Sequence, residues 1–308
     1  MKKDLLKMDD LSKDEILEIL NLADQLKYEL KHGIPHEHLK GKSLGMIFEK
    51  SSTRTRVSFE AGMYQLGGYP LFLSSKDLQI GRGEPIEDTA RVLSRFIQGI
   101  MIRTYSQNEV ETLAKYSSIP IINGLTDEEH PCQVLADLMT IREYKNSLEG
   151  LKVAYIGDGN NMAHSLMIGT LKVGMNFSIA CPDNYKPKDE YINRAKELAA
   201  KEGTTFKLVS SPKEAVIDAD VLITDVWASM GQESEAKERA KAFLGFQIND
   251  ELLSFAKPNS IVLHCLPAHR GEEITAKVIE DHSPEIFDES ENRLHAQKAV
   301  LVKLLTKN

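Results

Sequence analysis

The sequence predicts an α/β protein of two domains, each built on a mainly parallel sheet flanked by helices. The chain has 308 residues, which is too long for a single core of ordinary size. Its 42% hydrophobic and 27% charged residues are typical of folded globular proteins. Short apolar runs alternate along the chain with helical patterns, and this order is typical of mainly parallel sheets.

The first half of the chain is expected to form the first sheet and its helices. Apolar residues at helical spacing over 14–30 predict an amphipathic helix. The run LGMIFE, 44–49, predicts a strand, and it is followed by a helix that the glycines at 67–68 end. The runs PLFLSS, GIMIRT and IPIING predict three more strands, and a helix is expected over about 132–144.

A second domain is expected to begin after the segment NSLEG. We place the boundary so that residues 1–145 form the first domain and residues 146–290 the second. The runs VAYIG, FSIAC, ADVLITDVW and SIVLHCLP predict four strands of a doubly wound sheet, whose ligands bind at the carboxyl ends of the strands. The polar stretch SMGQESEAKERAKAF is expected to be a mobile loop or a short helix beside this sheet.

Charge and cysteine content exclude several classes of protein. A net charge of -8 argues against nucleic-acid binding, which requires an extended basic surface. Cys132, Cys181 and Cys265 are odd in number and widely spaced, which suits a reducing compartment and gives no metal-ligand spacing. The start of the chain lacks an apolar signal region, and no run of about 18 apolar residues follows. We therefore expect a cytoplasmic protein that does not bind a membrane.

The segment STRTR stands at the junction between a predicted strand and a predicted helix. Free backbone N–H groups and the helix dipole favour an anion at such a place. Ser52 is a suitable N-cap, and Arg54 can bind a phosphate through two parallel hydrogen bonds. The alternative is a capped helix that carries two solvated arginines, Arg54 and Arg56.

Arg103 and the segment HPCQ are expected at the same edge of the first sheet. Arg103 directly follows a buried type of strand, where a charge is costly unless an anionic or polar group pairs with it. His130 precedes a proline and a helix, and a histidine in that setting is often structural. The two residues together favour a binding site for an anion.

Polar residues also follow three strands of the second sheet. Asn160 and Asn161 end the first strand, Asp225 ends the third, and Ser229 follows it in the SMG segment. Cys265 lies in HCLPAHRG, where the last strand runs into a Pro/Gly turn. Each of these is weak evidence alone, since a buried cysteine can be inert packing, but together they line one edge of the sheet.

STRTR, HPCQ, DVW with SMG, and HCLPAHRG, in this order, resemble the motifs of the carbamoyltransferase family. The ornithine branch fits best, because SMG and HCLP distinguish it from the aspartate branch. The resemblance implies transfer of the carbamoyl group of carbamoyl phosphate to the δ-amino group of L-ornithine, giving citrulline and phosphate in arginine metabolism. It also implies that a C-terminal helix, residues 291–308, returns to the first domain. We expect no metal and no organic cofactor, because carbamoyl phosphate is already activated.

The resemblance also implies the roles of individual residues. Those expected to bind carbamoyl phosphate are Ser52, Thr53, Arg54, Thr55, Gln79, Arg103, His130, Gln133, Cys265, Leu266 and Arg293. Those expected to bind ornithine are Asn161, Asp225, Ser229 and Met230. Catalytic roles are expected for Cys265, Arg103 and His130. Gln79 matches a position that reaches the active site of a neighbouring subunit, which implies a homotrimer with shared sites.

Three alternatives compete with this interpretation. A nicotinamide-dependent dehydrogenase is suggested by the turn Gly157-Asp158-Gly159, but Met162 stands where a dinucleotide fingerprint needs a small residue. A non-catalytic phosphate sensor would be favoured by loss of an Arg, His or Cys from the motifs, and all are present. Putrescine, aspartate or an acylated ornithine could replace ornithine, but Asp225 with SMG suits a free α-amino and α-carboxylate group.

Overall fold

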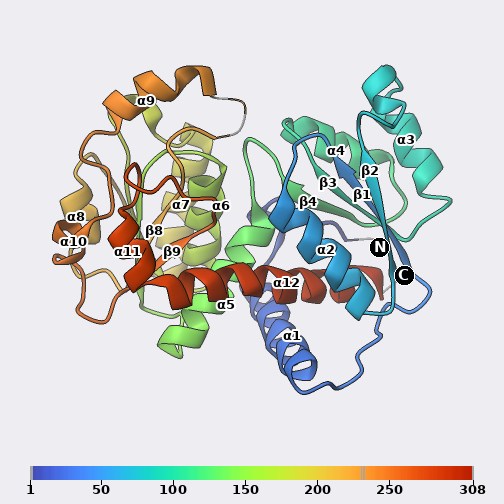
Figure 1. Cartoon of the computed structure of the whole chain (residues 1–308), viewed down its shortest axis with the longest axis horizontal. Helices are drawn as coiled ribbons and strands as arrows, with labels where there is room; N and C mark the ends of the chain where they lie inside the picture. The colour runs from blue at the N-terminus through green and yellow to red at the C-terminus, as the bar shows by residue number, and fades with distance from the viewer. Residues whose placement is uncertain (1–2, 230, 232, 307–308) are drawn as a thin grey trace. The chain divides into compact units, whose positions relative to one another are not determined.

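The computed structural model describes residues 3–229, 231 and 233–306 (Figure 1). The chain divides into two compact units, unit 1 (1–136 and 292–308) and unit 2 (137–291). Each unit contains one parallel sheet flanked by helices, which confirms the predicted fold class. The divisions fall inside two helices, α5 (Pro131–Lys145) and α12 (Ser283–Leu305). The domain boundaries proposed from the sequence stay predictions.

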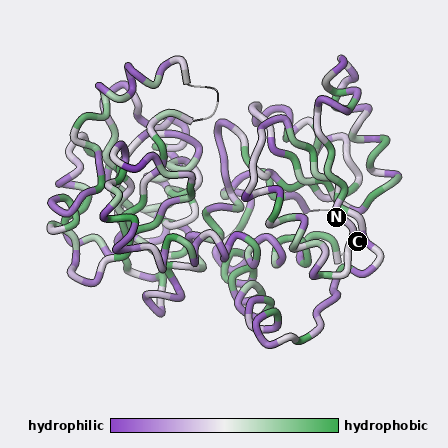
Figure 2. Tube along the Cα trace, viewed as in Figure 1, coloured by the Kyte–Doolittle hydropathy of each residue, from purple (hydrophilic) through white to green (hydrophobic). Residues whose placement is uncertain are grey.

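Unit 1 is built on a four-stranded sheet of order β2-β1-β3-β4, in which all paired strands are parallel. The strands are β1 (Ser43–Phe48), β2 (Tyr69–Ser74), β3 (Gly99–Arg103) and β4 (Ile121–Leu125). The helices are η1 (Met8–Asp10), α1 (Lys13–Lys31), α2 (Thr53–Gln65), η2 (Ile80–Arg82), α3 (Ile86–Leu93) and α4 (Gln107–Tyr116). Isoleucines of β1, β3 and β4 pack with apolar residues of α3 and α4 into one core cluster. Figure 2 shows the strands as the most hydrophobic segments of this unit.

The C-terminal helix α12 returns to unit 1, as predicted. Asn292 accepts a hydrogen bond from Lys27 of α1 at 2.8 Å. Gln297 of α12 and Ser58 of α2 are joined by a hydrogen bond of 2.5 Å. The last part of the chain therefore packs on α1, which precedes the first sheet, and on α2, which follows its first strand.

Unit 2 is built on a five-stranded parallel sheet of order β7-β6-β5-β8-β9. The strands are β5 (Lys152–Ile156), β6 (Asn176–Ala180), β7 (Phe206–Val209), β8 (Val221–Thr224) and β9 (Ile261–His264). The helices are α6 (Asn161–Lys172), η3 (Asp183–Tyr185), α7 (Asp189–Glu202), α8 (Pro212–Val216), η4 (Glu233–Glu235), α9 (Ala236–Ala242), α10 (Asp250–Leu253) and α11 (Ala276–Asp281). Apolar residues of α8, α10 and α11 pack against alternate residues of the strands to form its core cluster.

One detail of unit 2 differs from the expectation, and a second decides between two expected alternatives. The sequence predicted four strands and missed β7, because this strand lies at the edge of the sheet, is only four residues long and is not fully buried. The polar stretch after β8 contains η4 and the helix α9, so a short helix, one of the two expected alternatives, is present there.

Each sheet contains a point where the chain reverses the direction in which it adds strands. In unit 1 this switch point lies between β1 and β3, and in unit 2 it lies between β5 and β8. Loops that leave the carboxyl ends of two such strands diverge, and the crevice between them is the usual ligand site of an open α/β sheet.

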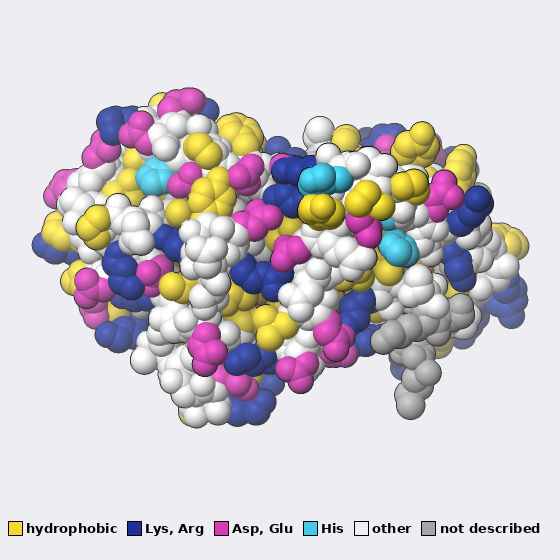
Figure 3. Space-filling view, turned by 90° about the horizontal axis from the view of Figure 1, so that it is seen from below, with side chains coloured by type: hydrophobic (Ala, Val, Ile, Leu, Met, Phe, Trp, Pro, Cys, Tyr) yellow, Lys and Arg dark blue, Asp and Glu magenta, His cyan; other side chains and the backbone are white. Residues whose placement is uncertain are grey.

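The surface carries charges of both signs. On the face drawn in Figure 3, acidic and basic side chains are interspersed and form no extended basic area. The whole sequence carries a net charge of -8. No helix in the described part of the chain is long and apolar enough to cross a membrane.

Candidate functional site

The loop after β1 leads directly into the N-terminus of α2 at the switch point of unit 1. Ser52 has an extended backbone, and its Oγ accepts a hydrogen bond from the N–H of Thr55 at 3.2 Å. Ser52 is therefore the N-cap that the sequence predicted. Thr53 is the first residue of α2, and Arg54 follows it half-buried. The positive end of the helix dipole and two side chains able to donate hydrogen bonds are thus gathered at one place.

The two arginines of STRTR have different surroundings. Arg56 is exposed, donates to Glu60 at 3.0 Å, and stacks its guanidinium 3.6 Å from the ring centre of Phe72. Arg54 is half-buried beside the helix N-terminus. Arg56 is thus engaged on the helix surface, which leaves Arg54 as the better candidate for an anion.

Arg293 joins α12 to the predicted binding residues of unit 1. Its guanidinium donates to Oε1 of Gln133 at 2.6 Å and to Oγ1 of Thr55 at 3.2 Å. His130 and Arg103 are also buried. Burial, together with the charges of Arg293 and Arg103, holds the pKa of His130 well below its ordinary value. The imidazole is therefore neutral at physiological pH and can donate a hydrogen bond without adding a third cation.

The position of Arg103 follows from the sheet. It is the last residue of β3, which lies between β1 and β4, so its backbone is at the carboxyl edge of the sheet interior. Its carbonyl accepts a hydrogen bond from the N–H of Glu49 at 2.9 Å, which ties the end of β3 to the loop after β1. The pairing with β4 shifts register between Ile102 and Arg103. Arg103 thus stands at the first position beyond regular pairing on that side.

A carboxylate pair beside Arg103 was missed by the sequence analysis. The hydroxyl of Thr104 lies within hydrogen-bond distance of a carboxylate oxygen of Glu109, at 2.5 Å, and of one of Glu49. The hydroxyl of Thr104 has one hydrogen, so it can donate to only one of these carboxylates at a time. Burial and the charge of Glu49 raise the pKa of Glu109. Glu49 could have been predicted from the sequence, because it directly follows the buried strand β1, just as the charged Arg103 ends β3.

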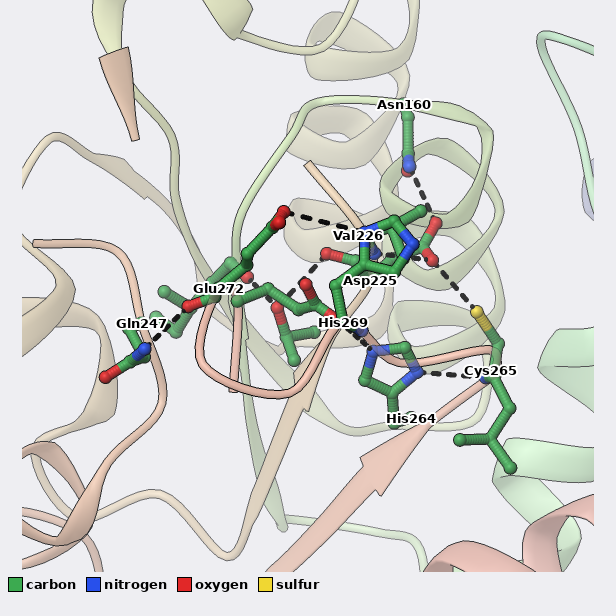
Figure 4. A network of polar contacts seen from close by, with 12 residues as sticks. Asn160, Asp225, Val226, Gln247, His264, Cys265, His269 and Glu272 are labelled. Atoms are coloured by element: carbon green, nitrogen blue, oxygen red, sulfur yellow. Dashed lines mark hydrogen bonds and ion pairs between the residues drawn. The ribbon is translucent and has the colours of Figure 1, made fainter. Parts of the chain in front are cut away.

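Asp225 is the centre of the polar network in unit 2 (Figure 4). It directly follows β8 and is buried. Its Oδ2 accepts a hydrogen bond from Nδ2 of Asn160 at 2.8 Å, and its Oδ1 accepts from the thiol of Cys265 at 3.1 Å. The N–H of Val226 donates to the same Oδ1 at 2.8 Å. Three donors therefore fix the carboxylate at the switch point.

Strand register and helix capping explain why these residues meet. Thr224 pairs with His264 across β8 and β9, so the residues that follow them, Asp225 and Cys265, leave the sheet side by side. Asn160 is the N-cap of α6 and uses its Oδ1 to accept from the N–H groups of the helix, which turns its Nδ2 toward Asp225. Burial and the charge of Asp225 raise the pKa of Cys265 well above its ordinary value. The thiol is thus protonated near neutral pH.

His264 and Glu273 support the segment that carries Cys265. Leu266 has a φ of 54°, in the left-handed region that is costly for a leucine. Its N–H donates to Nδ1 of His264 at 2.9 Å, so Nε2 carries the proton and donates to Oε1 of Glu273 at 3.0 Å. Both side chains are inaccessible to solvent. His264 is part of the HCLPAHRG motif but had no predicted role, and Glu273 lies beyond that motif and was not predicted.

Two places in unit 2 bear on the binding of a metal or a dinucleotide. In the described part of the chain, His269, Glu272 and Glu273 could together hold a metal ion, but Glu273 already accepts from His264 and from the N–H of His269. At the GDG turn, a Cβ on Gly159 would lie 2.1 Å from the backbone N of Pro187. The chain's own backbone therefore occupies the approach that a dinucleotide would need.

The remaining predicted residues have different outcomes. Asn161 is the first residue of α6 and is buried, and Ser229 is half-buried after β8. Gln79 is exposed just before η2. Met230 lies outside the described residues. The structure thus brings Thr55, Gln133 and Arg293 together in unit 1, where the charges of Arg103 and Arg293 also act on His130, and it joins Asp225 to Cys265 in unit 2.

Comparison with known proteins gives a consistent family. Residues 3–143 match the carbamoyl-P binding domain of the aspartate/ornithine carbamoyltransferases, and residues 149–304 match their Asp/Orn binding domain. The chain belongs to the aspartate/ornithine carbamoyltransferase family. It is 59% identical over 303 residues to an ornithine carbamoyltransferase of Carboxydothermus hydrogenoformans, an alignment that covers 98% of this chain and 97% of the relative. It is 56% identical over 305 residues to one of Methanosarcina mazei, covering 99% and 100%.

Solved structures of this family have the same fold. The ornithine carbamoyltransferase of Pyrococcus furiosus superposes with a TM-score of 0.95 at 54% identity, covering 99% of this chain and 97% of that one. The anabolic ornithine carbamoyltransferase of Campylobacter jejuni superposes with a TM-score of 0.94 at 44% identity, covering 99% and 100%.

Proposed function

We propose that this protein transfers the carbamoyl group of carbamoyl phosphate to the δ-amino group of L-ornithine, giving L-citrulline and phosphate. The observation that carries the proposal is the buried Asp225, fixed by Asn160 and Cys265 at the switch point of unit 2. A buried carboxylate there suits an amino-acid acceptor that carries an ammonium group. The close relatives named above as ornithine carbamoyltransferases support the same acceptor.

Carbamoyl phosphate would bind to the residues of unit 1. In this proposal Ser52, Thr53, Arg54 and Thr55 bind the phosphate at the N-terminus of α2, where charge grows as phosphate departs. Carbamoyl phosphate is a mixed anhydride with a good leaving group, so positioning and charge stabilisation suffice for transfer.

The carbamoyl group would be held by the buried side chains of the same unit. Arg103, Arg293 and the neutral His130 would donate to its carbonyl oxygen, and Gln133 would accept from its amide. A neutral imidazole is suited to this task, because it stabilises developing negative charge without needing to be deprotonated first. From unit 2, Cys265 and Leu266 would also contribute to binding the reacting group.

The acceptor would be held by residues of unit 2. Asp225, Asn161, Ser229 and Met230 are proposed to bind the α-amino and α-carboxylate groups of ornithine. Because the pKa of Cys265 is raised, its thiol is a hydrogen-bond donor and a poor nucleophile. The proposed reaction is therefore direct attack by the amine, with no covalent protein intermediate.

The attacking amine must first lose a proton. An alkylamine resembles lysine, with a pKa of about 10.4, so deprotonation near neutral pH costs roughly 4 kcal/mol. We propose that the cationic surroundings of bound carbamoyl phosphate disfavour a second cation at the reacting position, and that Asp225 and Cys265 orient the neutral amine. The protein needs no metal or organic cofactor for this chemistry.

The wider setting is proposed on the same basis. We place the enzyme in the cytoplasm, in arginine biosynthesis, which is consistent with its likeness to the anabolic protein of Campylobacter jejuni. We also propose a homotrimer in which Gln79 reaches the site of a neighbouring subunit. Tyr64 of α2 is 80% exposed and Tyr69 of β2 is 64% exposed, and large apolar side chains of this kind are suited to a subunit interface.

The decisive experiment measures citrulline formed by the purified protein from carbamoyl phosphate and a panel of acceptors. The panel is ornithine, putrescine, aspartate and N-acetylornithine. Activity with ornithine alone, lost in Asp225→Asn, is the expected result. Preference for putrescine or the acylated amine would overturn the assignment of Asp225, and absence of turnover with every acceptor would favour a non-catalytic sensor of phosphate compounds.

A further inference from the structure

Gln107 in unit 1 lies outside the predicted binding residues, and hydrogen bonds hold its amide in one orientation. It is the first residue of α4, and its side chain is buried. Its Oε1 accepts from Oγ1 of Thr126 at 2.8 Å and from Nδ2 of Asn123 at 3.3 Å. Its Nε2 donates to the carbonyl of Leu6 at 3.3 Å. Gln107 therefore joins α4 to the N-terminal segment, to β4 and to the loop that follows β4.

The N-terminal segment runs along the outer edge of β4. The N–H of Leu5 donates to the carbonyl of Ile121 at 2.9 Å, and the carbonyl of Leu5 accepts from the N–H of Asn123 at 2.8 Å. The carbonyl of Leu6 accepts from Nδ2 of Asn123 at 2.8 Å as well as from Gln107. Because β4 stands at the end of the sheet order, this segment holds the two amides from the edge of the sheet.

The hydroxyl of Thr126 closes the turn that leads from β4 to His130. The N–H groups of Glu128 and Glu129 donate to its Oγ1 at 3.3 and 3.0 Å, and the N–H of Thr126 donates to the carbonyl of Glu129 at 2.9 Å. The hydroxyl has one hydrogen, and when this hydrogen points to Gln107 the lone pairs face the two N–H groups. The other acceptor of this hydroxyl, the carbonyl of Glu129, is 3.5 Å away. Gln107 thus fixes the rotation of the hydroxyl that the turn needs.

His130 directly follows this turn, and the backbone is held on both sides of it. The N–H and the carbonyl of Glu129 are both hydrogen-bonded within the turn. The carbonyl of His130 accepts from the N–H of Gln133 at 3.1 Å, at the start of α5. The imidazole is buried, and the charges of Arg103 and Arg293 act on it. The turn therefore sets the place of the imidazole among these arginines, because it leaves the backbone little freedom.

We infer that Gln107 is a positioning residue for the carbamoyl donor, acting through Thr126 to hold His130 in its buried place. It touches no reacting atom. The inference rests on the proposed function, in which His130 donates to the carbamoyl oxygen. A wild-type protein that forms no citrulline would refute that function, whereas the surroundings of His130 can be measured without substrate and decide the inference by themselves.

The kinetic test compares Gln107→Met with the wild type. Methionine has a side chain of similar length but no amide, so Thr126 loses its acceptor. Loss of a donor to a developing oxyanion typically costs about 10²–10³-fold, and a displaced His130 is expected to cost part of this, about tenfold in kcat/KM for carbamoyl phosphate. KM for ornithine is expected to stay within about twofold, because the acceptor is bound by unit 2 in the proposed function.

Gln98→Met is the matched control for this substitution. Oε1 of Gln98 accepts from the N–H of Ser43 at 2.8 Å, so this amide also ties two segments of unit 1 together. Ser43 begins β1, at the end of the sheet opposite to His130. The control should therefore keep wild-type values of kcat and of both KM. Equal losses in the two variants, or a rise in KM for ornithine alone, would overturn the inference.

A cycle of double variants separates the positioning of His130 from a general effect on the fold. In His130→Ala the group that Gln107 positions is missing. Adding Gln107→Met to this variant should therefore lower kcat/KM for carbamoyl phosphate by less than about twofold further. Losses that add in full would show that Gln107 affects the reaction by a route other than His130 and would contradict the inference.

The titration of His130 gives a readout independent of turnover. Burial and the charges of Arg103 and Arg293 hold its pKa well below the ordinary value of about 6.5. In Gln107→Met the turn should loosen and admit water to the imidazole, so the pKa should rise toward that value. The same rise is not expected in Gln98→Met.

NMR spectra of protein labelled with ¹³C at Cε1 of histidine measure this titration from about pH 5 to about pH 8. The chain has nine histidines, and the signal of His130 is the one that His130→Ala lacks. An unshifted titration in Gln107→Met would overturn the inference even if the kinetic constants changed, because His130 would then have kept its surroundings.

Variants of Thr126 keep the test decisive if Gln107→Met does not fold. Thr126→Val removes the hydroxyl at nearly constant volume, and it should reproduce both the loss in kcat/KM for carbamoyl phosphate and the rise in the pKa of His130. Thr126→Ser keeps the hydroxyl and should restore wild-type values within about twofold. Wild-type behaviour of Thr126→Val, or equal losses in Thr126→Val and Thr126→Ser, would contradict the role of Gln107.

Discussion

The switch points of the two sheets share a topology and carry opposite charge. In unit 1, the loops after β1 and β3 and the helix α12 bring Arg54, Arg103 and Arg293 to the carboxyl edge. In unit 2, the loops after β5 and β8 bring Asp158 and Asp225 to the equivalent edge. The comparison teaches that sheet topology decides where a ligand binds, while the loop residues decide the charge of the ligand.

A histidine in unit 1 and a cysteine in unit 2 lie near these charges, and the charges shift their pKa values in opposite directions. His130 is kept neutral by burial and by the arginines around it, which lower its pKa. Cys265 is kept protonated by burial and by Asp225, which raise its pKa. Each region thus pairs its fixed charges with a neutral hydrogen-bond donor, and neither donor changes its charge near neutral pH.

The largest expected effect tests the cationic region of unit 1, that is, Arg54, Arg103 and Arg293. Replacing Arg54 by Ala should lower kcat/KM for carbamoyl phosphate by about 10²–10³-fold, because it removes the donor that we propose stabilises the developing phosphate charge. Arg56→Ala is the matched control on the same helix, since Arg56 is engaged by Glu60 and Phe72 and should cost less than about threefold. Steady-state kinetics with varied carbamoyl phosphate measures both. Equal losses in the two variants would remove the distinction drawn between these arginines.

A slightly smaller effect tests the acidic region of unit 2, that is, Asp158 and Asp225. Asp225→Asn should lower kcat/KM for ornithine on the order of 10²-fold, because it removes the buried charge that we propose pairs with the substrate ammonium. The KM for carbamoyl phosphate should stay within about twofold. Asp220→Asn is the matched control, because Asp220 lies at the opposite end of β8 and binds Lys257. If Asp225→Asn weakened carbamoyl phosphate as much as ornithine, the two regions would not be specialised.

Much of this organisation could be predicted from the sequence. The periodicity of apolar residues predicted the strands that carry the site, and Ser52 was predicted as a cap because serine readily satisfies a helix N-terminus. Arg103 was predicted from the cost of a charge at the end of a buried strand. Each of these signals is local in the sequence.

Contacts between distant segments could not be predicted in this way. The bonds of Arg293 to Gln133 and of Arg239 to Asp158 join residues far apart in the chain, and no local pattern indicates them. The resemblance to a known family supplied a role for Arg293, whereas Arg239 lies in a polar stretch that was expected to be a loop or a short helix. The edge strand β7 was missed because it lacks the long apolar run of an interior strand.

The pH dependence sharpens the comparison, because neither region contains a donor that titrates near neutral pH. His130 is neutral and Cys265 is protonated from about pH 6.5 to 8.5, so the substrate amine is expected to govern kcat/KM for ornithine. Its pKa of about 10.4 predicts a slope near one, that is, a rise of about 30-fold from pH 7 to 8.5.

Asp158, with a pKa of about 6, titrates below this range and should not contribute. Initial rates at low ornithine and saturating carbamoyl phosphate, taken in constant-ionic-strength buffers, give the profile. A flat profile over this range would mean that the ammonium form binds productively and that a group of the protein removes its proton.

The smallest effect distinguishes the cations that we propose bind substrate from a lysine that is buried in the fold. Lys298 of α12 has no accessible surface, and its Nζ lies 2.7 Å from Nε2 of His36 and 3.1 Å from Oε1 of Gln65. Burial lowers its pKa to about 8, against the opposing charge of Glu29. The unfolded chain therefore binds more protons between pH 8 and the usual lysine pKa of about 10.4, so the free energy of unfolding rises with pH over that window.

Lys298→Met should abolish this pH dependence of the free energy of unfolding while leaving kcat/KM for both substrates unchanged. Relative to the wild type, the variant is expected to be most stable at pH 7 and to lose at most about 1.4 kcal/mol of that advantage per pH unit above pH 8. Urea unfolding at pH 7, 8.5 and 10 measures the difference, with Lys303→Met as a control, because Lys303 is on the same helix but pairs with Glu18. A difference between Lys298→Met and wild type that is independent of pH would show that Lys298 keeps an ordinary pKa, and a loss of activity would place this lysine among the cations that serve the site.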